Sequence, residues 1–353
     1  MLQYAGVDFS NDKVRVVLVA RDSTVTLEHE TRLLGLTADA DGAAASIAPA
    51  EWTRAADFAL REAFLALPVS SRQIAGIGLS GPSGWIAIDR ELRPMAALRL
   101  CAPDRVGAEI AAWLAEDERH KRRVEMLLSP KDWYRFASSQ TFAADITSAA
   151  RESLLSDSGN DWDRGRLAAH SIERAWMPPV FPPSARTGRF GERGAAETGL
   201  PGSPWLAAGC SRESAALLAA GDLRRRKLWC APDGTRAVYT TPSRPAVVPD
   251  GFLALPAPWE GHWSLERTFS PERERGAELE RARADLVSSG LEVEAVIETR
   301  GDPAVGAALC AAIATGLVKD WDRLYRVYRV PGDSDEPAAD ASSDAGEARP
   351  EEA

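Results

Sequence analysis

The sequence contains little of what metal-binding, disulfide-stabilised or membrane-spanning proteins need. Its 353 residues include only four cysteines and four histidines, widely spaced and without a CxxC or HxxxH pair. We therefore expect no metal site built on them, and we expect the thiols to be reduced and mostly buried. No apolar run approaches the roughly 18 residues of a membrane span. Because the chain opens directly into a strand-like segment rather than a signal peptide, we expect a cytoplasmic protein that contacts no membrane.

Basic excess is also lacking, and the acidic charge is unevenly spread. The net charge is −10, but the segment after residue 332 carries eight acids against Arg349 alone. Without any aromatic residue, this segment has too little apolar surface to order itself, and we expect residues 331–353 to form an acidic disordered tail. The rest of the chain carries only about −3, and we expect no nucleic-acid partner.

What is present is the composition of a globular protein, with 45% apolar and 27% charged residues. A chain of this length exceeds one ordinary core, so two packed lobes are expected. Strand-rich portions at both ends, with helices crossing between groups of strands, predict a mixed α/β sheet. The predicted strands are 2–9, 13–20, 24–32, 74–79, 85–89, 205–208, 226–240, 251–255, 262–267 and 291–298, the first two and the fourth and fifth being read as pairs. The predicted helices are 51–67, 212–220, 271–289 and 302–316, with a helix-rich stretch over 106–170 and an extended surface connection at the proline-rich 177–183.

Four stretches, in order, resemble the FGGY family of carbohydrate kinases, the xylulokinase branch above all. They are YAGVDFSNDKVRVVLVARD, IAGIGLSGPSGWIAIDRELRPMAAL, LLSPKDWYRFASSQTFAADITSAARESLLSDSGNDWDRGRLAA and TGLPGSPWLAAGCSRESAALLAAG. The resemblance implies the two-lobed actin-like (ribonuclease H-like) α/β fold of sugar kinases, with a first lobe over 1–200. A long stretch before the last helix is missing, so the second lobe, 201–330, is expected to be trimmed.

The resemblance also implies a site that binds ATP and Mg²⁺. Asp8 stands where the family has its metal-linked Asp, and Ser10 follows it in a turn that lacks the Gly-Thr of the family's phosphate loop. From the residues alone, an acid capping a hairpin turn explains Asp8 equally well. Gly234 and Thr235 retain the Gly-Thr of the second phosphate turn, although Asp-Gly is also a common hairpin signal.

The substrate positions are altered in the same comparison. Ser83 and Trp85 lie where the family has amide and imidazole donors. The pair Asp104 and Arg105 could still bind the hydroxyls of a sugar or polyol, and a surface ion pair at a helix start is the alternative interpretation.

The residue at the position of the catalytic base decides whether the chain can transfer a phosphate. Where the family has an Asp, this sequence has Arg212, whose guanidinium stays protonated and cannot accept a proton. Glu213 is the neighbouring candidate for a substitute base, and a Glu stabilised by the helix dipole in a first turn is its structural alternative.

Three hypotheses follow. The first is a carbohydrate kinase homologue with impaired catalysis that binds a sugar-like metabolite or a protein partner. The second is an active ATP-dependent carbohydrate kinase with a rearranged site. The third is a regulatory or assembly subunit of another kinase, for which a homodimer or a protein partner is expected. Whether the chain is an enzyme is left open by the replaced Asp.

Overall fold

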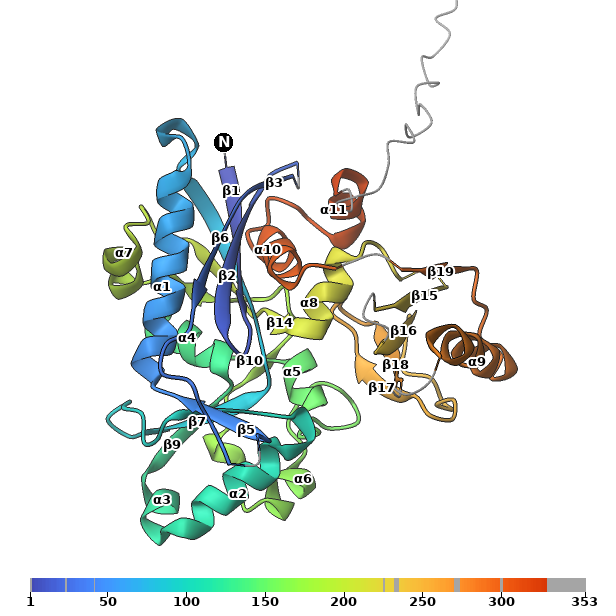
Figure 1. The fold of residues 1–353 in the computed structure, drawn as a ribbon, viewed down its shortest axis with the longest axis horizontal. Coiled ribbons are helices and arrows are strands. Elements are labelled where there is room, and N and C mark those ends of the chain that lie inside the picture. Colours follow the sequence, from blue (N-terminus) through green and yellow to red (C-terminus); the bar gives the residue numbers. More distant parts are fainter. Residues whose placement is uncertain are drawn as a thin grey trace, which may run out of the picture.

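The computed structural model describes residues 2–22, 24–40, 42–224, 226–231, 235–269, 274–298 and 301–328. They form two lobes joined by two helices that lie side by side between them (Figure 1). The helices are α8 (Arg212–Ala219) and α10 (Pro303–Ala314). The expected acidic tail lies outside the described residues.

The first lobe is built on a seven-stranded mixed sheet. An antiparallel meander of β1 (Leu2–Phe9), β2 (Lys13–Ala20) and β3 (Val25–Arg32) is extended by β6 (Gln73–Gly81), which runs parallel to β1. The remaining strands are β13 (Trp205–Ala207), β12 (Arg186–Arg189) and β14 (Cys210–Ser211). The central strands are apolar and buried because helices cover both faces of the sheet, α1 (Pro49–Ala66) on one side and α10 on the other.

Glycines let α10 lie directly on this sheet. A Cβ atom at Gly6 would be 1.7 Å from the Ala304 carbonyl oxygen, and one at Gly78 would be 1.8 Å from that of Ala307. Only glycine permits so close an approach of helix and strand. The N-terminus of α10 is thereby held beside the end of β1, at the edge where the two lobes meet.

The rest of the first lobe surrounds a second, five-stranded antiparallel sheet. Its strands are, in order, β4 (Thr37–Ala38), β5 (Ala44–Ile47), β8 (Leu98–Cys101), β7 (Gly84–Asp89) and β9 (Val124–Leu128). The short strands β10 (Ala144–Asp145) and β11 (Val180–Phe181) pair with each other. The helices are α2 (Val106–Glu116), α3 (Glu118–Arg123), α4 (Pro130–Ser139), α5 (Ile146–Arg151), α6 (Arg164–Ala169) and α7 (Glu192–Thr198), with 3-10 turns at Val69–Ser71, Pro103–Arg105 and Arg174–Trp176.

The second lobe is a five-stranded sheet with a helix on one face. The strand order is β17 (Leu253–Pro256), β18 (Trp263–Thr268), β16 (Arg236–Thr241), β15 (Lys227–Cys230) and β19 (Ala295–Ile297). Helix α9 (Arg275–Ser288) shares a core with these strands, and α11 (Trp321–Val327) packs with α8 and α10.

The predicted mixed sheet and two-lobed architecture are confirmed, while some local predictions are wrong. Residues 74–79 and 85–89 do not pair with each other, because β6 and β7 belong to different sheets. The helix-rich stretch contains strand β9, and the proline-rich 177–183 contains strand β11 and a buried Met177. All four cysteines are free, and three of them are buried, as expected. No helix within the described ranges has the length and apolar character to span a membrane.

Candidate functional site

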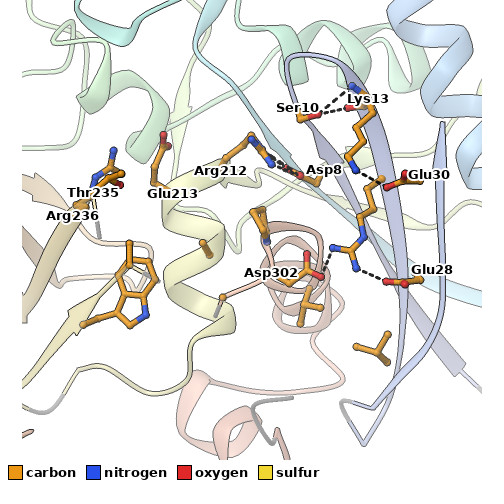
Figure 2. A pocket seen from close by; sticks show the side chains of 18 of the residues that line it. Asp8, Ser10, Lys13, Glu28, Glu30, Arg212, Glu213, Thr235, Arg236 and Asp302 are labelled. Carbon is orange, nitrogen blue, oxygen red and sulfur yellow. Dashed lines mark hydrogen bonds and ion pairs between the residues drawn. The ribbon is translucent and has the colours of Figure 1, made fainter. Parts of the chain in front are cut away.

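A cleft of about 1230 Å³ lies between the lobes. The β1–β2 hairpin, helix α8, the N-terminus of α10 and strands of the second lobe contribute to its walls (Figure 2). Among the described residues, nine charged side chains line it: Asp8, Lys13, Arg15, Glu28, Glu30, Arg212, Glu213, Arg236 and Asp302.

An ion pair between Asp8 and Arg212 lies at the centre of the cleft. Arg212 Nε lies 3.0 Å from Asp8 Oδ1, and Arg212 Nη2 lies 3.0 Å from Oδ2. Ser80 Oγ donates a further hydrogen bond of 2.7 Å to Oδ1, because Ser80 is opposite Asp8 in the parallel register of β1 and β6. The Asp8 side chain is 6% exposed and that of Arg212 is 37% exposed. Figure 2 shows Arg212 reaching from α8 to the end of β1.

This arrangement does not fit a divalent cation on Asp8. The pKa of Asp8 lies above its usual value because burial raises it. The charge and hydrogen bonds of Arg212 and the hydroxyl of Ser80 offset only part of that rise. Both carboxylate oxygens accept hydrogen bonds, and the positive guanidinium of Arg212 lies beside them, where it would repel a divalent cation. Within the part of the chain that the structure describes, no group of three or more His, Cys, Asp or Glu side chains is placed to hold a metal ion. The interpretation of Asp8 as a hairpin cap is also wrong, since Ser10 bonds across that turn instead.

Glu213, the candidate substitute base, lines the same cleft with its side chain 38% exposed. Its Oε2 lies 3.3 Å from Nε of Arg151. Burial raises the pKa of Glu213, but the charges of Arg151, Arg236 and Arg212 outweigh burial, so the pKa lies below its usual value. The carboxylate is therefore ionised, but its pairing and lowered pKa make it a weak proton acceptor.

Arg151, which the sequence did not single out, links the two lobes beneath the cleft. Its Nη2 donates to both oxygens of Glu266, each at 2.7 Å, and its Nε donates to Ser211 Oγ at 3.1 Å. Arg151 ends α5 in the first lobe, whereas Glu266 lies on β18 in the second. No sequence signal marks this pair, because 115 residues separate its members.

A buried polar network fixes the start of α8. Lys131 Nζ lies 2.7 Å from both Asp132 Oδ1 and Asp145 Oδ2, and Arg135 also pairs with Asp132. Asp145 accepts a hydrogen bond from the Thr147 hydroxyl, whose oxygen accepts the backbone N–H of Ser211 at 2.9 Å. The residue before Arg212 is therefore anchored to the core of the first lobe.

The structure describes only some of the residues predicted to bind phosphates. Ser10 lines the cleft, and its hydroxyl donates to Asp12 Oδ1 and to the Lys13 carbonyl, both at 2.9 Å. Thr235 also lines the cleft, whereas Gly234 lies outside the described residues. The strands β15 and β16, before and after this segment, are antiparallel, with Cys230 opposite Ala237.

The four residues predicted to contact substrate do not line this cleft. Trp85 is buried, with its ring centroid 5.3 Å from that of Trp113. Arg105 pairs with Glu109 at 2.9 Å, while Asp104 is exposed and Ser83 half-buried. Their role in binding stays a prediction.

Comparisons with known proteins identify relatives of the chain. Residues 101–218 match the N-terminal domain of the FGGY family of carbohydrate kinases. Xylulose kinases of Klebsiella pneumoniae and Escherichia coli are 26% and 24% identical over 286 and 287 residues, in each case 72% of this chain and 56% of the relative. The chain thus spans little more than half the length of these curated relatives.

Solved structures agree on the fold. The xylulose kinase of Rhodospirillum rubrum superposes with a TM-score of 0.78 at 14% identity, covering 92% of each chain. That of Lactobacillus acidophilus has a TM-score of 0.73 at 11% identity, covering 93% of this chain and 92% of its own. These likenesses confirm the predicted actin-like sugar-kinase fold.

Proposed function

We propose that this chain, a relative of the FGGY family of carbohydrate kinases, binds a sugar-like metabolite between its lobes and does not transfer phosphate to it. The observation that carries the proposal is the bidentate pairing of Arg212 with Asp8. Arg212 stands where the family has its catalytic base, and Asp8 stands where the family has its metal-linked acid. In this chain the two side chains form an ion pair with each other.

Phosphoryl transfer from ATP needs a carboxylate to accept the alcohol proton, a divalent cation on the phosphates and donors that hold the phosphates. Arg212 cannot accept a proton. Asp8 has no free oxygen for a metal, because Arg212 and Ser80 bond to both of its oxygens. The family's use of ATP and Mg²⁺ therefore comes to this chain by resemblance only, and its residues do not fit that cofactor pair.

A coupled ADP-release assay tests the proposal. The full chain is incubated with ATP, Mg²⁺ and a panel of D-xylulose, other pentuloses, polyols and hexoses, with an active xylulose kinase as the positive control. We expect no sugar to raise ADP release above the background measured without sugar. Sugar-dependent turnover that disappears in Glu213→Gln would overturn the proposal.

One observation favours a second candidate, an active kinase with a rearranged site. Asp8 and Glu213 line the same cleft, as that hypothesis requires. In this candidate Glu213 accepts the proton after release from Arg151. It predicts that Arg151→Ala raises turnover and that Glu213→Gln abolishes it, whereas the first candidate predicts no turnover in either variant.

The predicted trimming of the second lobe favours the assembly hypothesis as a further candidate, since the match to the Klebsiella pneumoniae xylulose kinase covers only 56% of that relative. A subunit that docks on another kinase would purify with it or dimerise. Native mass measurement on the purified chain, alone and mixed with an active xylulose kinase, distinguishes this case. Monomers alone in both samples would exclude it.

A further inference from the structure

Every charged side chain among the described residues that line the interlobe cleft lies within 3.9 Å of an opposite charge. Lys13 pairs with Glu30 at 2.7 Å. Arg15 pairs with Glu28 and Asp302. The other contacts are those of Arg212 with Asp8 at 3.0 Å, Glu213 with Arg151 at 3.3 Å and Arg236 with Glu266 at 3.9 Å. Among the described lining residues, each cation and each carboxylate therefore has an oppositely charged neighbour, and Arg236 has the most distant one.

Such a cleft is a poor site for a polyphosphate. The described residues of the lining include four cationic side chains and five carboxylates, so an incoming triphosphate meets no net positive charge from them. Taking Arg212 for a phosphate would also leave the buried Asp8 without its partner, and an unpaired buried charge is costly. Without a metal on Asp8, the positive charges of the described lining that could face the phosphates are side chains that already lie beside carboxylates.

An uncharged polar ligand faces neither difficulty. A hydroxyl group donates and accepts, so it can bond to the outer N–H and oxygen atoms of an ion pair without separating the pair. The cleft also has apolar and aromatic lining, including Val305, Trp229 and Tyr328, against which the C–H groups of a polyol can pack. The lining thus matches a compact molecule rich in hydroxyl groups.

We infer that this cleft takes an uncharged, hydroxyl-bearing ligand without a divalent cation and excludes ATP and other polyphosphates. The inference rests on the proposed function and deepens it, because it names the charge class of the ligand and removes the nucleotide from the site. It concerns binding alone, so it is separable from the absence of phosphate transfer.

Calorimetric titration of the full chain with pairs of neutral and charged ligands of similar size tests whether the cleft selects uncharged ligands. Sorbitol and gluconate differ by one charge at similar size, as do D-xylulose and its 5-phosphate. ATP and ADP are titrated with Mg²⁺ and with EDTA. We expect saturable binding of a neutral probe, binding at least tenfold weaker for its charged match, and no ATP or ADP binding in either buffer. The inference is overturned by nucleotide binding in the cleft, or if no neutral probe binds.

Two variants locate the binding. Ala216→Phe places a bulky ring into the cleft and should abolish binding of the neutral probe, whereas Arg54→Ala, which removes an exposed arginine paired with Glu51 on α1, should not. The melting temperature of each variant verifies folding. Equal binding by both variants would place the ligand elsewhere and overturn the inference.

A separate experiment tests whether the site binds its ligand without a divalent cation. Arg212→Ala frees the carboxylate of Asp8, so Mg²⁺ alone should raise the melting temperature of this variant but not that of the wild type or Arg54→Ala. A Mg²⁺-dependent shift already present in the wild type would overturn the inference. ATP binding without turnover would contradict this inference and spare the proposed function, whereas sugar-dependent turnover would contradict the proposed function itself.

Discussion

At the scale of single residues, the pair of Arg212 and Asp8 should be measurable as a coupling energy. Arg212→Ala leaves a nearly buried carboxylate with only Ser80 as a partner, and we expect a loss of about 1–3 kcal/mol in unfolding free energy. The lower end is expected because Arg212 is partly exposed. Asp8→Asn in the same background should recover part of this loss, since a neutral amide needs no counter-charge. Urea unfolding of the double-mutant cycle measures both effects.

The matched control is Arg54→Ala, whose exposed pair with Glu51 should contribute less than about 1 kcal/mol. If Arg212→Ala lowers the unfolding free energy no more than Arg54→Ala does, the pair of Arg212 and Asp8 is as weak as a surface ion pair. It would then not prevent a metal from binding Asp8.

Glu152 is a second residue with a measurable signature. It is buried, and its Oε1 has no hydrogen-bond partner among the residues that the structure describes. Burial together with the charges of Asp132 and Asp145 raises its pKa from 4.5 to about 8. Between pH 4.5 and about pH 8, Glu152 is therefore protonated in the folded state and ionised in the unfolded state. Its stabilising effect is fully present below about pH 4.5 and is lost as the pH rises to about 8.

Glu152→Gln stays neutral at every pH, so we expect a variant that loses less stability between pH 5 and pH 8 and that melts above the wild type at pH 9. Thermal unfolding across this range measures the difference. Glu125→Gln, at an exposed position, should follow the wild-type curve. A Glu152→Gln profile parallel to the wild type would show that this carboxyl is ionised in the folded protein.

The sequence identified single site residues better than it identified their partners. The resemblance placed Asp8, Arg212 and Glu213, and all three line one cleft. It did not reveal that Arg212 pairs with Asp8, because a bond across 204 residues leaves no local pattern. Arg151 was missed for the same reason.

At the scale of elements, the packing of α8 against α10 holds Arg212 in place. Both helices approach at Gly306, where a Cβ atom would lie 1.9 Å from the Ala215 carbonyl oxygen. Backbone must move to admit it, so Gly306→Ala should destabilise the fold by about 1–3 kcal/mol despite the higher helix propensity of alanine.

Gly276 provides the opposite case within α9. A Cβ atom there meets nothing within 4 Å, so Gly276→Ala should stabilise the fold by about 0.5–1 kcal/mol. Urea unfolding of the two variants measures both effects. Similar values for the two would mean that α8 and α10 separate readily and that Arg212 is loosely held.

Element prediction succeeded where the local pattern was strong. The runs 2–9 and 13–20, rich in β-branched residues, correspond to β1 and β2, and the helical spacing of apolar residues in 51–67 corresponds to α1. It failed where tertiary pairing decides, because a turn between 81 and 84 looks like a hairpin whether or not the flanking strands pair.

At the scale of the whole molecule, length and composition predicted two lobes, and only the family resemblance supplied their topology. Neither could show how the lobes are held relative to each other. That information lies in contacts between α5 and β18, which depend on the folded arrangement of both lobes.

The bidentate pair of Arg151 with Glu266 is the contact expected to limit motion between the lobes. Its members are 10% and 8% exposed, so removing Arg151 leaves Glu266 with only a distant contact to Arg236. Arg244 also reaches across, to Asp157 at 3.9 Å, but both side chains are exposed and their pair should contribute little.

Arg151→Ala should therefore speed amide hydrogen exchange in α5 and β18 and increase the radius of gyration in solution scattering, whereas Arg244→Ala should change neither. The reason is that a buried bidentate pair links rigid elements of both lobes, while the exposed pair links side chains that water screens. Unchanged exchange in both variants would mean that α8 and α10 alone hold the lobes together, and the cleft would then be free to open for larger ligands.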